Sequence, residues 1–160
     1  MEMDYSFLKA DGQPTTDEAD ACSTNLSFKD DGTGLGIALA VPSKTYPLTY
    51  MIKMCSEFVD RLGHTLVTIR TDNEPSISVV LDGVLRLRNT SEFERTFKEY
   101  TPRYSSQSLG SVGVFQRTLN GDVKTLRYQA EAFYGQKFLP THNVWPWLVR
   151  HANFVRGCFT

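Results

Sequence analysis

The sequence predicts an α/β domain: a mixed sheet of five strands, three antiparallel and then parallel ones, with helices on both faces. Two short runs of alternating polarity near the N-terminus are followed by an Asp-Gly turn and an apolar run, which is typical of antiparallel strands. Later, apolar stripes at spacings of three and four alternate with strand-like runs. A helix between two strands of one sheet implies a right-handed crossover and parallel pairing. The length of 160 residues predicts one domain, spanning residues 1–160.

The first third of the chain holds the predicted antiparallel strands. In residues 1–8, Met3, Tyr5 and Phe7 alternate with polar residues, so Asp4 is expected to point away from the aromatic face. Residues 9–23 are polar and predict a loop. A second strand is expected at 25–29, and the apolar run at 35–41 predicts a central strand that is covered on both faces.

The rest of the chain predicts alternating helices and strands. The expected elements are a helix from Thr45 to Gly63, a strand at 66–71, a helix at 75–87, a short strand at 96–100, a long helix from Ser111 with an apolar stripe from Val112 to Phe133, and a last helix at 144–159. Thr45 and Asn143 are candidate helix caps, because their side-chain oxygens can accept first-turn N–H groups.

Composition excludes several classes of protein. At 41% hydrophobic and 12% aromatic residues, wholesale disorder is excluded. No apolar run is long enough for a membrane span, and the start does not resemble a signal peptide, so no membrane partner is expected. Cys22, Cys55 and Cys158 are far apart and form no zinc motif, which indicates a reduced, intracellular setting.

The net charge of −1 hides an asymmetry between the two ends. Residues 1–31 contain eight acids and two lysines, whereas residues 86–160 contain eleven Lys and Arg against five acids, a balance of +6. The C-terminal half is therefore suited to a polyanion. The alternative is an ordinary solvated surface. On charge alone, this alternative is favoured over a surface that binds a polyanion.

The run from Leu66 to Thr71 ends in Asp72, and Asn73 and Pro75 follow. Such a pattern predicts a buried strand that delivers one carboxylate to the end of a sheet, where ligands bind in open α/β folds. The alternative is that Asp72 only caps the next helix, with Pro75 in its first turn. The residues of this stretch leave both interpretations open.

Three short motifs give the chain a family resemblance. They are Met3-Asp4-Tyr5, Arg70-Thr71-Asp72-Asn73-Glu74-Pro75-Ser76-Ile77 and Tyr104-Ser105-Ser106-Gln107-Ser108-Leu109-Gly110-Ser111-Val112. Together they resemble the integrase catalytic core of retroviruses and LTR retrotransposons, which has a ribonuclease-H-like fold. The segment from Trp145 to Ala152 is similar to copia-type elements.

The resemblance implies DNA integration by metal-dependent polynucleotidyl transfer, with Mg²⁺ or Mn²⁺ and a nuclear location. It implies that Asp4 and Asp72 are catalytic residues and metal ligands. The family places a glutamate third ligand where this sequence has Gly113, which cannot bind a metal. A degenerate active site is therefore expected, and enzymatic activity stays open. The alternative is a ribonuclease-H-like nuclease whose third ligand is an acid from elsewhere in the chain. The acids considered for that place are Glu74, Glu92, Glu94 and Glu99.

The resemblance also implies a DNA-binding surface. Gly113, Arg117, Asn120, Lys124 and Arg127 share one side of the long helix, the side that faces DNA in the family. Arg103, Tyr104 and Gln107 lie in the preceding loop and can also contact nucleic acid. The expected partners are DNA and a second copy of the chain. The alternatives are a solvated helix face and, for the whole chain, a non-catalytic DNA-binding or assembly module.

Overall fold

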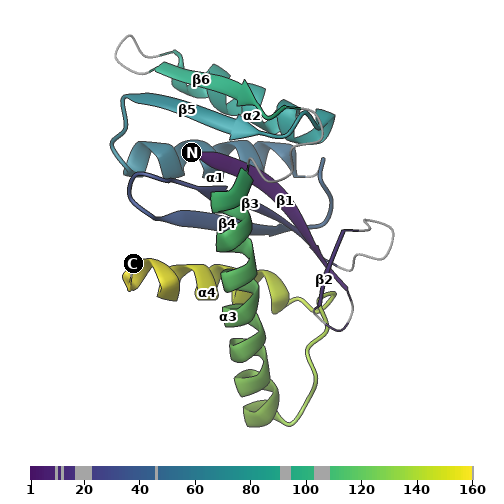
Figure 1. Ribbon diagram of the computed structural model, residues 1–160. Coiled ribbons are helices and arrows are strands. Elements are labelled where there is room, and N and C mark those ends of the chain that lie inside the picture. The colour runs from purple at the N-terminus through teal and green to yellow at the C-terminus, as the bar shows by residue number, and fades with distance from the viewer. Residues whose placement is uncertain are drawn as a thin grey trace.

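The computed structural model describes residues 1–9, 11, 13–16, 23–45, 47–90, 95–102 and 109–159. Its elements are β1 (Glu2–Leu8), β2 (Pro14–Thr15), β3 (Ser23–Lys29), β4 (Gly36–Val41), α1 (Leu48–Arg61), β5 (Leu66–Thr71), α2 (Pro75–Arg88), β6 (Arg95–Tyr100), α3 (Gly110–Tyr134) and α4 (Trp145–Cys158) (Figure 1). The α/β class and the order of helices and strands are thus confirmed.

The strands form one mixed sheet with the order β4-β3-β1-β5-β6. The first three of these neighbours pair antiparallel, and β1-β5 and β5-β6 pair parallel, as predicted. Two expectations are wrong. The sheet has a sixth strand, because β2, inside the predicted polar loop, pairs with β1. The apolar strand β4 lies at the edge of the sheet and not in its centre.

Helices cover both faces of the sheet (Figure 1). The helices α1 and α2 pack on one face around Met3, Phe28 and Ile69, and α3 and α4 pack on the other face around Ala38 and Phe115. The strand β4 contributes to both cores, which explains its continuous apolar sequence. The strand β5 buries Val67, Ile69 and Thr71 on one face, whereas Leu66 and Thr68 on its other face are exposed.

The ends of the helices differ from the predicted caps. The N-cap residues of α1 and α4 are Pro47 and Val144, and neither helix has a side-chain cap hydrogen bond, so Thr45 and Asn143 do not cap them. Gly63 adopts a φ of 70° just after α1, as expected for a residue that ends a helix. The far end of α3 extends beyond the sheet, and Phe133 is 82% exposed rather than part of a buried stripe (Figure 1).

Candidate functional site

The strands β1 and β5 and the helix α3 bring Asp4, Asp72 and Gly113 to one pocket. Asp4 lies on the strand face opposite Met3, and Asp72 directly follows β5, the parallel neighbour of β1. The start of α3 lies over β1 (Figure 1), and Gln116 of α3 contacts the backbone of Asp4. The pocket has a volume of about 460 Å³ and is lined by Asp4, Tyr5, Ser6, Phe7, Pro14, Thr15, Thr16, Lys44, Asp72, Glu74, Gly113, Gln116, Arg117 and Asn120.

Asp4 carries the strongest electrostatic signal of this pocket. Its pKa is raised to about 7, first by burial and then by the negative charges of Asp72 and Glu74. The backbone N–H of Tyr5 donates a hydrogen bond of 2.8 Å to Asp4 Oδ1, which opposes that shift. Gln116 Nε2 donates to the backbone oxygen of Asp4 at 3.3 Å and so ties α3 to β1. Asp4 is therefore a half-buried carboxyl group beside two other acids.

Asp72 lies in the turn between β5 and α2. Its Oδ1 accepts a hydrogen bond of 3.3 Å from the backbone N–H of Glu74. The N-cap residue of α2 is Glu74, and no side chain caps this helix, so the interpretation of Asp72 as its cap is wrong. Burial and the charge of Glu74 raise the pKa of Asp72. Asp72 thus faces the pocket as an acid in a negative field.

Glu74 belongs to the same pocket, and its partners could not be found by sequence reasoning. Lys44 Nζ lies 2.7 Å from Glu74 Oε1, and the Ser76 hydroxyl donates a hydrogen bond to the same oxygen. Lys44 comes from the link between β4 and α1, thirty residues away, so no local pattern pairs the two. The Phe7 ring lies 4.9 Å from the Lys44 ammonium and forms a cation–π contact with it.

Gly113 leaves room for the side chain that the family resemblance predicts. A Cβ atom built at Gly113 meets no heavy atom within 4 Å. Another candidate acid, Glu99, is engaged elsewhere, because it pairs with Arg70 at 3.3 Å. The expectations for Glu92 and Glu94 lie outside the described residues.

Asp4 and Asp72 are the candidate ligands of the pocket for a divalent cation. Carboxylate oxygens are the ligands that Mg²⁺ prefers, and a cation would relieve the repulsion that raises the pKa of Asp4. Two aspartates do not fit a pair of ions, however. In the described part of the chain, no three His, Cys, Asp or Glu side chains are placed to hold one metal ion together.

The predicted nucleic-acid contacts divide into four groups. Arg117 is exposed, and both Arg117 and Asn120 line the pocket. Lys124 lies further along α3, with its Nζ 6.0 Å from the centre of the Tyr128 ring. Arg127 is only 8% exposed, donates to Glu131 and to the backbone oxygen of Asp11, and is therefore not available as a phosphate contact. The predictions for Arg103, Tyr104 and Gln107 lie outside the described residues.

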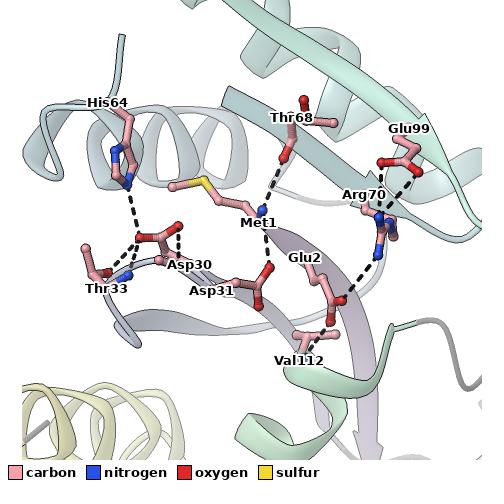
Figure 2. A network of polar contacts seen from close by, with 11 residues as sticks. Met1, Glu2, Asp30, Asp31, Thr33, His64, Thr68, Arg70, Glu99 and Val112 are labelled. Atoms are coloured by element: carbon pink, nitrogen blue, oxygen red, sulfur yellow. Dashed lines mark hydrogen bonds and ion pairs between the residues drawn. The ribbon is translucent and has the colours of Figure 1, made fainter. Parts of the chain in front are cut away.

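A polar network that the sequence did not reveal fixes the start of α3 (Figure 2). The backbone N–H of Val112 donates a hydrogen bond of 2.9 Å to Glu2 Oε2, and Glu2 is only 6% exposed. Arg70 Nη1 lies 3.9 Å from Glu2 Oε1, so β5 joins the same network. At the other end of Figure 2, His64 Nε2 lies 3.0 Å from Asp30 Oδ2. The Glu2 network thereby positions the helix that carries Gly113.

The remaining candidate residues have structural explanations. Cys55 is buried in the core. Trp145 is buried in the core as well, whereas Trp147 is exposed and stacks on His151 with ring centres 4.8 Å apart.

Among the helices in the described ranges, none is long and apolar enough to cross a membrane.

No protein-family model matches this sequence, and no curated protein matches it. The functional assignment therefore rests on the residues of the pocket and on the resemblance of the motifs.

Proposed function

We propose that the chain is a retroelement integrase core-like domain with a ribonuclease-H-like fold, and that its active site lacks one carboxylate ligand. In this proposal the domain binds DNA, takes part in DNA integration in the nucleus, and holds Mg²⁺ or Mn²⁺ through Asp4 and Asp72. The sheet order, with three antiparallel strands followed by two parallel ones, supports this fold.

One observation carries the proposal. Asp4 and Asp72 are 68 positions apart and Asp72 and Gly113 are 41 apart, yet all three residues line one pocket. The motif resemblance assigns the three ligand positions of the family to these three residues. Two acids that meet at one pocket with a raised pKa at Asp4 support a cation site.

In this proposal one set of residues holds the cation and another set, on α3, binds DNA. Asp4 and Asp72 hold the cation, and Gln116 keeps α3 against β1 through the backbone of Asp4. Arg117 and Asn120, on the same side of α3, bind the phosphate backbone of DNA. A bound divalent cation supplies stabilisation of the attacking or leaving oxygen of a phosphodiester. With two carboxylates only, the site holds this cation weakly.

The second candidate is a non-catalytic DNA-binding or assembly module on the same fold. The absence of a side chain at Gly113 favours it, because a binding module needs the basic face of α3 and not a complete metal site. The two candidates share DNA binding and differ in whether the metal site can be completed.

The substitution Gly113→Glu tests the first candidate against the second. The added side chain has room, since nothing lies within 4 Å of a Cβ atom at this position. We expect Gly113→Glu to gain Mn²⁺-dependent nicking or joining of labelled DNA that the unchanged protein lacks. Gly113→Gln is the matched control, because it has the same size and helix preference without the charge.

Two results would decide otherwise. If Gly113→Glu gains no activity while DNA binding stays intact, the binding module is the better account. If the unchanged protein joins DNA efficiently, the idea of an incomplete site is wrong.

A further inference from the structure

A second pocket lies beside the first turns of α3. It has a volume of about 410 Å³, and the residues that line it come from the end of β3, the last turn of α4 and α3 itself: Lys29, Arg156, Ser111, Val114, Phe115 and Thr118. Helical spacing places its α3 residues on the side of the helix opposite those that line the pocket of Asp4. No aspartate or glutamate is among its described lining residues. This pocket is therefore positively charged and separate from the Asp4 pocket.

An aromatic ring forms part of the wall of this pocket. Lys29 and Gly36 are direct partners in the pairing of β3 with β4. A Cβ atom built at Gly36 would lie 2.8 Å from the Phe115 ring, so the missing side chain of Gly36 makes room for this ring. The Lys29 ammonium lies 5.9 Å from the ring centre and forms a cation–π contact with it. Val114, which is 54% exposed, adds a second apolar surface beside this cation.

Lys29 is a half-buried cation close to a second positive charge. Burial lowers its pKa, Asp31 and Asp30 oppose this shift, and the charge of Arg156 lowers the pKa further. Both acids pair with other groups outside the pocket (Figure 2). In the described part of the chain, no carboxylate lies within ion-pair distance of the Lys29 ammonium. An anion between Lys29 and Arg156 would remove the repulsion between these two cations.

The guanidinium of Arg156 is oriented from outside the pocket. Its Nε and Nη2 atoms donate hydrogen bonds of 3.1 and 2.8 Å to Asp122 Oδ2. Asp122 lines a different pocket, between α3 and α4, so its carboxylate does not fill this one. A side chain that is already held in one orientation loses less conformational freedom when it binds a ligand.

We propose that this pocket binds the phosphate group of a phosphate ester between Lys29 and Arg156, with the Ser111 hydroxyl as a further donor. Arginine matches the oxygens of a phosphate through parallel N–H donors, and lysine adds a compact charge. The organic part of the ester packs on Val114 and Phe115. The site needs no bound metal ion and is therefore independent of the proposed metal site.

Two sources can supply such a phosphate: a nucleic-acid backbone or a small phosphate ester. The helix α3 lies between two pockets that both carry positive charge, since Arg117 lines the other one. A nucleic-acid strand that crosses this helix would contact both pockets. The backbone as source rests on the proposed DNA binding, whereas a small ester as source does not.

Amide NMR shifts of the isotope-labelled full chain test the site, at constant ionic strength and with a chelator present. The probe is phenyl phosphate, and benzoate, a carboxylate of similar size, is the comparison. We expect saturable shifts at Ser111 and Thr118 with phenyl phosphate and clearly weaker binding of benzoate. Equal affinity for the two probes, or no saturable shift with phenyl phosphate, would overturn the proposal.

Lys29→Gln removes one of the two cations. We expect it to weaken binding of phenyl phosphate about tenfold or more, because a hydrogen bond to a charged group contributes a factor of about that size. Lys53→Gln removes an exposed lysine from α1 and is the matched control, which should leave the affinity unchanged. Equal effects of these two substitutions would refute the role of Lys29.

Arg156→Gln and Asp122→Asn separate the charge of Arg156 from its structural contact. Both break the pair between α3 and α4, but only Arg156→Gln removes a cation from the pocket. Arg156→Gln should therefore weaken binding of phenyl phosphate, whereas Asp122→Asn should bind it at least as tightly as the unchanged protein. Urea unfolding without phosphate shows that each variant is folded. Equal losses in the two folded variants would contradict a direct role of Arg156.

A single-stranded oligonucleotide without terminal phosphates distinguishes the two sources. If it displaces phenyl phosphate and Lys29→Gln weakens its binding as well, the source is the nucleic-acid backbone. If it does not compete while phenyl phosphate binding depends on Lys29, the source is a small ester, and the site stands even where the proposed DNA binding fails. If Arg117→Gln weakens DNA binding while Lys29→Gln affects neither probe, the proposed function stands and this pocket is not a phosphate site.

Discussion

Glu2 Oε2 accepts a hydrogen bond of 2.9 Å from the backbone N–H of Val112, which joins residues 110 positions apart in the chain. The contact is buried and lies at the first turn of α3, where backbone N–H groups lack partners within the helix (Figure 2). A carboxylate at a helix N-terminus also interacts favourably with the helix dipole. Glu2 therefore sets where α3 begins and where its pocket-lining residues lie.

Removing this carboxylate should destabilise the fold. Glu2→Ala leaves the Val112 N–H buried without its acceptor, and we expect the free energy of unfolding to fall by about 1–3 kcal/mol. Glu2→Gln keeps an oxygen acceptor and should lose less. Urea unfolding followed by circular dichroism measures both, with Glu57→Ala as an exposed control. Equal stability of Glu2→Ala and the unchanged protein would contradict this role.

Arg88 is a second buried charge with long-range partners. Only 1% of its side chain is exposed, and it contacts Asp60, the Thr96 hydroxyl and the backbone oxygen of His64. We expect Arg88→Met to lower the free energy of unfolding by about 3 kcal/mol, because a buried network loses its central donor. Thermal and urea unfolding measure this loss. Arg86→Met, on the exposed side of α2, should change stability by less than about 0.5 kcal/mol, and a similar loss in both variants would refute the role of Arg88.

The sequence predicts the order of elements well because the signals for it are local. Alternation in β1 places Met3 in the core and Asp4 opposite to it, and the run before Asp72 ends where β5 ends. The position of β4 could not be predicted in this way. Helices cover both of its faces, so its apolar pattern is the same at the edge of a sheet as in the centre.

The contacts between the residues of the site could not be predicted from the sequence. Lys44 and Glu74 are thirty positions apart, and their pairing depends on how the β4–α1 link packs beside the end of β5. Helical spacing assigned Arg127 to the side of Arg117, but it could not show that Arg127 bonds to Glu131 and to the backbone of Asp11. Contacts with another segment of the chain decide which residues at the far end of α3 are buried. The periodicity within one helix holds no information about those contacts.

Arg117 and Arg127 should therefore respond differently to substitution. Arg117→Gln removes an exposed charge, and we expect weaker DNA binding with a salt dependence whose slope is smaller by about 1. Arg127→Gln should lower the stability and leave the slope of the folded protein unchanged, because its charge is already paired with Glu131. Fluorescence anisotropy of a labelled duplex at several salt concentrations measures both. A larger change of slope in Arg127→Gln than in Arg117→Gln would contradict the assignment.

The raised pKa of Asp4 makes the contribution of this group to the stability of the metal-free protein smaller at neutral pH than in mild acid. Its value of about 7, against 3.8 ordinarily, means that between these pH values the unfolded chain has released this proton while the folded chain retains it. The free energy of unfolding contributed by this group therefore falls as the pH rises from about 4 to 7, and it stays low above pH 7.

Asp4→Asn should remove this fall, because the amide carries no charge to bury and its oxygen can still accept the Tyr5 N–H. We expect Asp4→Asn to match the unchanged protein near pH 4 and to exceed its free energy of unfolding by about 1–4 kcal/mol at pH 8. Urea unfolding from pH 4 to 8 with a chelator present measures the difference. Asp82→Asn, which alters an exposed acid paired with Lys98, is the control for the general effect of charge. Stability curves for Asp4→Asn and the unchanged protein that run parallel across this range would show that burial and the neighbouring acids do not hold the proton on Asp4.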